Sequence, residues 1–287
     1  MTVRFGILGE LRVEAAERTV RLGPPKQRLL LAVLLCQLDR PVSVPSLVDA
    51  LWECRPPASA VENVRSYVHR LRRLLGAGVE LRGGNGGYGL IVDPASVDAH
   101  RFTDLARRGE SALARDDPTV ARSLLRQALA LWRGRPFAGL EPAAVLATES
   151  TRLEEHRLSV AELWVDAELR LGGGAELVSD LRSMVAVHPY RERYWCQLMT
   201  ALHRSARRAD AIAAYHQART VLAEDLGIDP GIELTALYLS ILRDEPPPTA
   251  GASGRFVTRG PERRRPTCCP PRRPARWPRG PQARRRA

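Results

Sequence analysis

The sequence of 287 residues lacks any apolar run near the ~18 residues of a membrane-spanning helix, and it lacks a basic-then-apolar signal region at its N-terminus. Its five cysteines are scattered and form no CxxC pair, which argues against a zinc site and a disulfide framework. Cys36 and Cys196 fall within apolar helical patterns and are expected to be core thiols. These absences predict a protein of the reducing cytoplasm with no membrane partner.

Signatures of catalysis are missing as well. The six histidines form no HExxH motif, no G-x-S-x-G elbow is present, and the glycine run at 83–87 lacks the Gly-Lys-Ser/Thr ending of a phosphate-binding loop. We therefore expect no catalytic residues, no metal and no cofactor, and an enzyme is the disfavoured alternative.

Aromatic residues make up only 5% of the chain, but the hydrophobic fraction of 44% is ample for roughly two domains of ~100–200 residues. The net charge of +12 is unevenly spread, because residues 246–287 alone contain twelve arginines and one glutamate. That segment is Pro-, Gly- and Arg-rich, so we expect a disordered tail that adds salt-sensitive affinity for nucleic acid or has no role. Residues 1–92 remain moderately basic and residues 93–245 mildly acidic.

The most informative stretch is the predicted helix at 59–75. One face is apolar, Ser59 and Glu62 have the spacing of a capping box, and Gly76 stands where the helix should end. The other face carries four arginines, a histidine and small polar groups. Such a face suits a helix in the DNA major groove, and a solvated basic surface is the alternative.

The neighbouring elements predict a winged helix over residues 1–92. Two antiparallel strands precede three helices, and a β-hairpin around a Gly-Gly-Asn-Gly-Gly turn follows them. The expected ranges are strands at 4–13 and 18–22, helices at 25–38, 45–52 and 59–75, an extended segment at 41–44, and the hairpin at 79–92.

Residues 93–245 predict an all-α domain. Trp195, Leu198, Leu202, Ala211, Tyr215 and Ala218 have the spacing of a tetratricopeptide-like (TPR-like) helix pair, whose stacked helices suit a protein partner or simply pack together. The fold class is thus an α+β winged helix followed by an all-α TPR-like domain. The expected helices are 98–115, 118–133, 142–171, 175–187, 191–205, 207–225 and 231–243.

Over residues 3–245 the chain resembles the Streptomyces antibiotic regulatory protein (SARP) family, which joins an OmpR-type winged helix to a bacterial transcriptional activation domain. The resemblance rests on several stretches in the same order, namely LGPPKQRLLLAVLL, VSVPSLVDALW, SAVENVRSYVHRLRRLLG, GGYGL and HPYRERYWCQLMTALHRSARRADAIAAYHQARTVLAEDLGIDPGIEL. The later stretch is the most diagnostic. No receiver-like segment lies ahead of the winged helix, so we expect the two-domain form of the family.

The resemblance implies an activator in the nucleoid that binds direct repeats near a promoter −35 element. It would self-associate on DNA, recruit RNA polymerase through a sigma factor or the alpha subunit, and switch on a secondary-metabolite cluster. For base contact it implies Asn63, Arg65, Ser66 and Arg70, and for phosphate contact Lys26, Arg28, His69, Arg72 and Arg73.

The wing departs from the family pattern. Related wings end Gly-Tyr-Arg, whereas here Gly89 follows Tyr88, so the cation that enters the minor groove is missing and only Arg82 could replace it. We therefore expect weaker or less shape-dependent DNA binding than is usual in the family. Two alternatives stay open, a TPR-like interaction scaffold with a degenerate winged helix and a repressor with the same DNA contacts.

Overall fold

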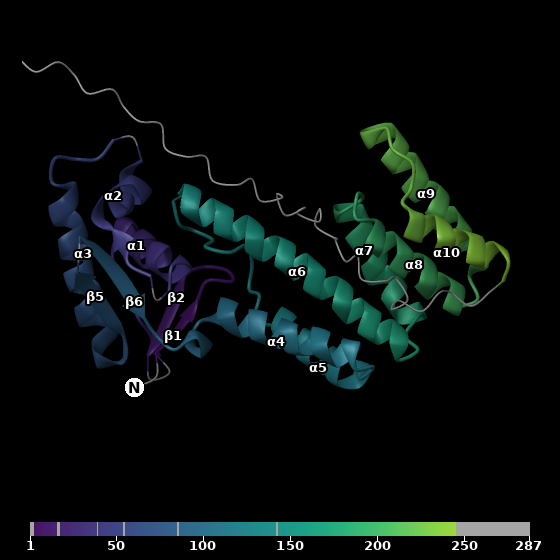
Figure 1. Ribbon diagram of the computed structural model, residues 1–287, viewed down its shortest axis with the longest axis horizontal. Coiled ribbons are helices and arrows are strands. Elements are labelled where there is room, and N and C mark those ends of the chain that lie inside the picture. The colour runs from purple at the N-terminus through teal and green to yellow at the C-terminus, as the bar shows by residue number, and fades with distance from the viewer. Residues whose placement is uncertain are drawn as a thin grey trace, which may run out of the picture. The chain divides into compact units, whose positions relative to one another are not determined.

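The computed structural model describes residues 3–15, 18–38, 40–53, 55–84, 86–141 and 143–244. Its first part alternates short strands with three helices, as Figure 1 shows. The elements are β1 (Val3–Gly6), β2 (Arg12–Ala15), β3 (Arg18–Thr19), α1 (Pro25–Cys36), β4 (Val42–Ser43), α2 (Val44–Trp52), α3 (Ala60–Leu75), a 3-10 turn η1 (Gly76–Gly78), β5 (Glu80–Gly84) and β6 (Gly87–Ile91).

The prediction of one strand over 4–13 was wrong, because that stretch forms the two antiparallel strands β1 and β2. Phe5 pairs with Val13, and the chain turns between them through Gly9 at φ +148°, a conformation that side chains rarely adopt. The short β3 pairs with β2 and completes a sheet in the order β1-β2-β3.

The predicted hairpin is confirmed as β5 and β6, and β4 joins it to form a second sheet in the order β4-β6-β5. Three helices followed by this hairpin make a winged helix, as expected from the order of elements. The hairpin tip lies beyond the last ladder pair, Gly84 with Gly87.

The remaining described residues form helices joined by loops, in the predicted order, but the helix predicted over 118–133 ends at Leu129 and residues 130–141 form a loop. A long helix, α6, has 27 residues, and a 3-10 turn precedes α7. None of the described helices is long and apolar enough to cross a membrane. The elements are η2 (Pro94–Ser96), α4 (Asp98–Ala114), α5 (Pro118–Leu129), α6 (Ala144–Arg170), η3 (Ala175–Leu177), α7 (Val178–Val187), α8 (Glu192–Arg204), α9 (Arg208–Leu226) and α10 (Ile232–Leu242).

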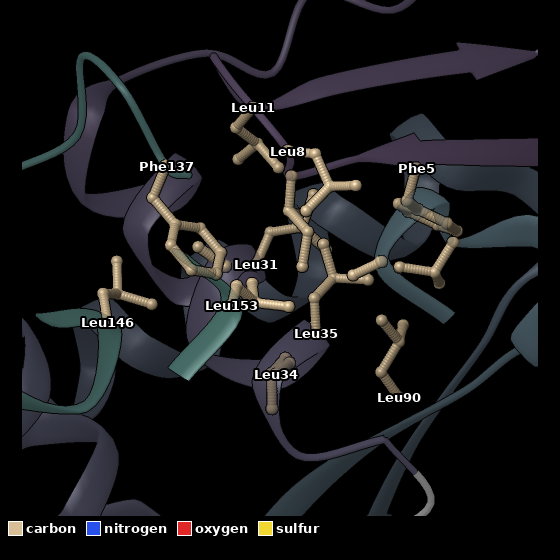
Figure 2. Close-up of a cluster of buried hydrophobic side chains, with 14 of the residues drawn as sticks. Phe5, Leu8, Leu11, Leu31, Leu34, Leu35, Leu90, Phe137, Leu146 and Leu153 are labelled. Atoms are coloured by element: carbon tan, nitrogen blue, oxygen red, sulfur yellow. The ribbon is translucent and has the colours of Figure 1, made fainter. Parts of the chain in front are cut away.

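Helix α1 is apolar on every side, and residues 29–35 are all at most 2% exposed. Figure 2 shows Leu31 of α1 in one cluster with Phe137 and with Leu146 and Leu153 of α6. The hydrophobic core that starts at Val3 therefore continues across the predicted boundary at 92–93 as far as Ala167. The boundary is a change in secondary structure and does not separate two cores.

A second core lies among α7, α8, α9, α10 and the C-terminal part of α6. All six residues with the predicted TPR-like spacing are buried in it. Trp164 of α6 packs against both cores, so this one helix belongs to each.

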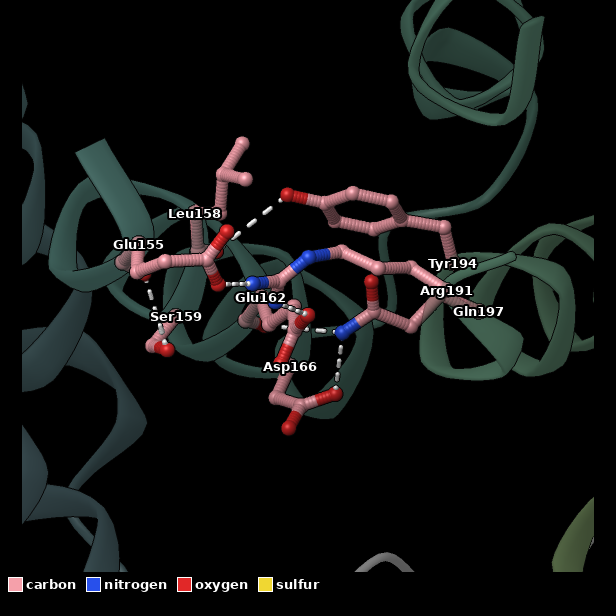
Figure 3. Close-up of polar contacts among 8 residues, drawn as sticks. All are labelled: Glu155, Leu158, Ser159, Glu162, Asp166, Arg191, Tyr194 and Gln197. Carbon is pink, nitrogen blue, oxygen red and sulfur yellow. Dashed lines mark hydrogen bonds and ion pairs between the residues drawn. The ribbon is translucent and has the colours of Figure 1, made fainter. Parts of the chain in front are cut away.

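Polar contacts also join α6 to α8 (Figure 3). Arg191 at the start of α8 forms ion pairs with Glu155 and Glu162, the latter at 2.7 Å. Gln197 donates from Nε2 to the Glu162 carbonyl at 2.8 Å and to Asp166 Oδ1 at 2.7 Å. The Gln197 bonds are buried or partly buried and so stabilise more than the exposed Arg191–Glu155 pair, and they hold the second core in a defined position on α6.

Asp98, the first residue of α4, ties the β1–β2 turn to the helical part. Its buried carboxylate accepts the backbone N–H groups of Ile7 at 2.8 Å and Leu8 at 3.1 Å. Arg133 donates to the same carboxylate at 2.8 Å, and its own backbone N–H binds the Leu8 carbonyl. Every polar group at this contact is satisfied.

We expect Asp98→Ala to lower the free energy of unfolding by about 2–4 kcal/mol, because it leaves two backbone N–H groups without an acceptor and removes the carboxylate that pairs with Arg133. Urea unfolding followed by circular dichroism measures this. The control is Asp104→Ala, whose carboxylate forms exposed ion pairs only and should change the midpoint little. Equal midpoints for the two variants would contradict the role given to Asp98.

A second expectation concerns folding of the winged helix alone. A fragment of residues 1–92 would expose the side of α1 that α6 covers, so we expect no cooperative unfolding transition and low solubility. Residues 1–248, the compact unit of the chain, should unfold cooperatively. A sharp thermal transition of the 1–92 fragment would show that the shared core is dispensable.

Candidate nucleic-acid interface

Helix α3 has the amphipathic layout that its sequence predicts. Val64, Val68, Leu71 and Leu75 are buried against the first core. The helix ends at Gly76, whose φ of +68° and N–H bond to the Arg72 carbonyl stop it where predicted. The opposite side faces outward and carries the predicted contact residues.

The predicted capping box does not form. Ser59 is the N-cap residue, but its side chain accepts no backbone N–H; its Oγ instead accepts the Asn63 side-chain amide at 3.2 Å. Glu62 pairs with Arg65 at 2.6 Å. Because both partners of the box are engaged one turn further along the helix, the reciprocal backbone bonds are absent.

The outward side of α3 divides into two rows at helical spacing. The first row is residues 63, 66, 70 and 73, and the second is 62, 65, 69 and 72. In the first row Arg70 and Arg73 are exposed and have no hydrogen bond or ion pair with any residue that the structure describes. Their guanidinium groups are thus available to an anionic or polar ligand.

The two arginines of the second row bind other groups of the protein. Arg65 is held by Glu62, whereas His69 is exposed. Arg72 donates from Nε and Nη2 to the Leu81 carbonyl of β5, at 3.0 and 2.7 Å. Arg72 therefore holds the wing against α3. Only its Nη1 group has no bond in the described structure, so the predicted phosphate contact stays a prediction for that group.

The two cations at the start of α1 are also paired. Lys26 donates to the Leu51 carbonyl and to Glu141, each at 2.5 Å, and so joins α1 to α2 and to the segment before α6. Arg28 forms a 3.4 Å ion pair with Glu10. A phosphate would have to displace these carboxylates, a constraint that sequence spacing did not indicate.

The wing presents one cation among its described residues. Arg82 binds Glu80 through two hydrogen bonds of 2.6 and 3.1 Å, which raise the pKa of Arg82 and lower that of Glu80. Its charge is thereby largely neutralised. Tyr88 is half-buried on β6, next to Gly83.

The wing glycines differ in the room that they leave for a side chain. A Cβ on Gly87 would meet the Val42 carbonyl oxygen at 2.5 Å, and one on Gly89 would lie 3.6 Å from the backbone at Arg40 and Pro41. Gly84, at the end of β5, has open space around it and no positive φ. A cation could therefore be added at the tip through Gly84, whereas position 89 faces the loop before β4.

Groups suited to catalysis are not gathered in the part of the chain that the structure describes. No three His, Cys, Asp or Glu side chains there lie close enough to hold a metal ion. Burial raises the pKa of the Cys36 and Cys196 thiols to about 12, which keeps them protonated and unreactive. Burial lowers the pKa of His156, whose ring packs edge-on against Phe102. The tail and its cysteines lie outside the described residues.

Comparison with known proteins gives a consistent result. Residues 97–242 match the family described as "Bacterial transcriptional activator domain". The chain is 38% identical over 254 residues to the regulatory protein DnrI of Streptomyces peucetius, a match that covers 85% of this chain and 93% of DnrI. It is 39% identical to the regulatory protein AfsR of Streptomyces griseus, but this chain spans only 26% of that protein's length.

A solved structure shares the fold. The Mycobacterium tuberculosis protein EmbR, solved in complex with a low-affinity phosphopeptide, matches with a TM-score of 0.83 and 37% identity. The match covers 86% of this chain and 67% of the EmbR chain. The likeness includes both the strand-containing first part and the helices after it.

Proposed function

The chain belongs to the SARP family of transcriptional activators, and from this premise we propose that α3 reads promoter DNA in the major groove. The observation that carries the proposal is the row of Asn63, Ser66, Arg70 and Arg73, whose two arginines have no partner in the described part of the protein. A guanidinium matches the O6/N7 pair of guanine and an amide matches adenine. Arg65 would join the base contacts once it leaves Glu62. Phosphate contacts would come from His69 and Arg73, with Arg72, Lys26 and Arg28 contributing after they exchange their present partners.

The proposed operator is a direct repeat. Protomers bound head to tail would lie about 10–11 base pairs apart, so that both copies of α3 face the same side of the duplex. The helical part would recruit RNA polymerase, through its sigma factor or alpha subunit, to the promoter of a secondary-metabolite cluster. Support for this part comes from family membership and from the match to the activation-domain family.

Selection from random duplex DNA tests the proposal. Residues 1–248 are used at ~150 mM salt, because the twelve arginines of the tail would bind most DNA without sequence preference. We expect enrichment of a motif repeated at one-turn spacing. Arg70→Ala should lose about 1–3 kcal/mol of discrimination at one base position, whereas Arg182→Ala, an exposed arginine on α7, should behave like the unaltered protein.

Two results would contradict the proposal. An unchanged base preference at every position of the motif after Arg70→Ala would remove this residue from base contact. No enrichment at all would favour the interaction scaffold with a degenerate winged helix.

The wing yields a further expectation. Gly84→Arg places a cation in open space at the tip, so DNA affinity should rise and the salt dependence should steepen by about one phosphate contact. Gly84→Glu is the matched control and should weaken binding. Fluorescence anisotropy across a salt series measures both, and equal affinities for the two variants would mean that the tip does not approach the DNA.

A further inference from the structure

Large apolar side chains are exposed together at one end of the second core. Ile232 is 89% exposed and Val187 is 71% exposed, and Tyr190, Leu226 and Ile228 are about half exposed. We call these five residues the end patch. Apolar side chains that are this exposed and close together commonly mark an interaction surface.

The path of the chain brings these residues together. Helices α8 and α9 are antiparallel neighbours joined by a short loop, so the α7–α8 loop and the α9–α10 loop are on the same side of the helix pair. Tyr190 donates its hydroxyl to Asp225 at 3.2 Å, and the Gly231 N–H binds Glu192 at 2.7 Å. These bonds hold the α7–α8 loop against the end of α9 and the start of α10.

Packing does not account for the end patch. The buried side of α10 is made by Leu234, Leu237 and Ile241, which fill the second core. Ile232 lies outside this buried side of α10. A β-branched residue does not favour helix formation either, so helix propensity does not explain an isoleucine at this position. The exposed side chains are therefore free to contact a partner.

The rim of the end patch is acidic. Glu224 and Asp229 are exposed and have no ion pair among the described residues, and Asp225 binds only the Tyr190 hydroxyl. The nearby Arg191 and Arg193 are neutralised by the carboxylates of α6, Glu155, Glu162 and Asp166. DNA is repelled by such a rim, whereas a basic protein surface is attracted.

We propose that the end patch is the surface on which RNA polymerase docks, through a basic segment that carries one or two apolar anchors. The inference rests on the proposed function, which requires a polymerase contact away from α3. Polymerase modules that lie on promoter DNA beside an activator carry basic surfaces, because they bind phosphates themselves. An apolar patch with an acidic rim is complementary to that surface and does not compete for the DNA.

The test uses the full chain, purified RNA polymerase holoenzyme and a labelled operator duplex. Ile228→Ser/Ile232→Ser should weaken polymerase binding about tenfold, the loss typical of removing an interface anchor. Val120→Ser, a similarly exposed apolar residue on α5, should leave binding unchanged. Thermal unfolding and operator affinity should be the same for all three proteins, because the replaced side chains are outside the cores.

Charge is tested separately. Glu224→Lys/Asp229→Lys should weaken polymerase binding and reduce its salt dependence, whereas Glu110→Lys on the exposed side of α4 should not. Polymerase binding that is equal in all variants overturns the proposed surface. Operator binding with no polymerase binding by the unaltered chain overturns both this proposal and recruitment, and absent operator binding overturns DNA recognition by α3.

Two other occupants would be recognised by different results. If Ile228→Ser/Ile232→Ser abolishes self-association in analytical ultracentrifugation, the end patch holds a second copy of the chain. If that double variant changes the hydrodynamic radius of the full chain but not that of residues 1–248, the chain's own arginine-rich segment occupies it. Either result, together with unchanged polymerase binding by the double variant, overturns polymerase as the occupant.

Discussion

A helix that is apolar on every side must be covered on every side, and the rest of the structure follows from this constraint on α1. The N-terminal sheet, α2, α3 and the wing cover part of it, and α6 with the segment around Phe137 covers the remainder. Helix α3 and the long helix α6 therefore pack on the same buried helix. Asp98 adds a polar tie at the edge of this core, where it satisfies the β1–β2 turn.

The cations of the chain serve different purposes that their spacing in the sequence does not distinguish. Arg72 and Lys26 bind backbone carbonyls and hold the wing and α1 in place, and Arg133 satisfies the buried Asp98. Arg70 and Arg73 remain without partners in the described structure. Because an ion pair must be broken before a phosphate can take its place, the proposed DNA contacts rest first on the unpaired arginines.

Positive and negative surfaces lie on different parts of the fold. The unpaired arginines are on α3, within the moderately basic first 92 residues, and the acidic rim of the end patch is at the junction of α8, α9 and α10. Since like charge repels the DNA backbone, the acidic rim is suited to protein contacts and the unpaired arginines to an anionic ligand. The proposed promoter contact and the proposed polymerase contact would therefore not compete for one surface.

Local patterns in the sequence determined the elements, because helix periodicity, Gly76 and the glycine-rich turn act over a few residues. They also identified the outward side of α3, and the order of the motifs identified the family. The sequence was insufficient in three places. Residues 4–13 form two strands, with a turn at Gly9 whose neighbours Ile7 and Leu8 donate to Asp98. Ser59 and Glu62 of the predicted capping box bind the nearby Asn63 and Arg65, and the shared core extends across residue 92. Which arginines are free was likewise decided only by tertiary structure, because their partners come from other elements such as Leu81 on β5.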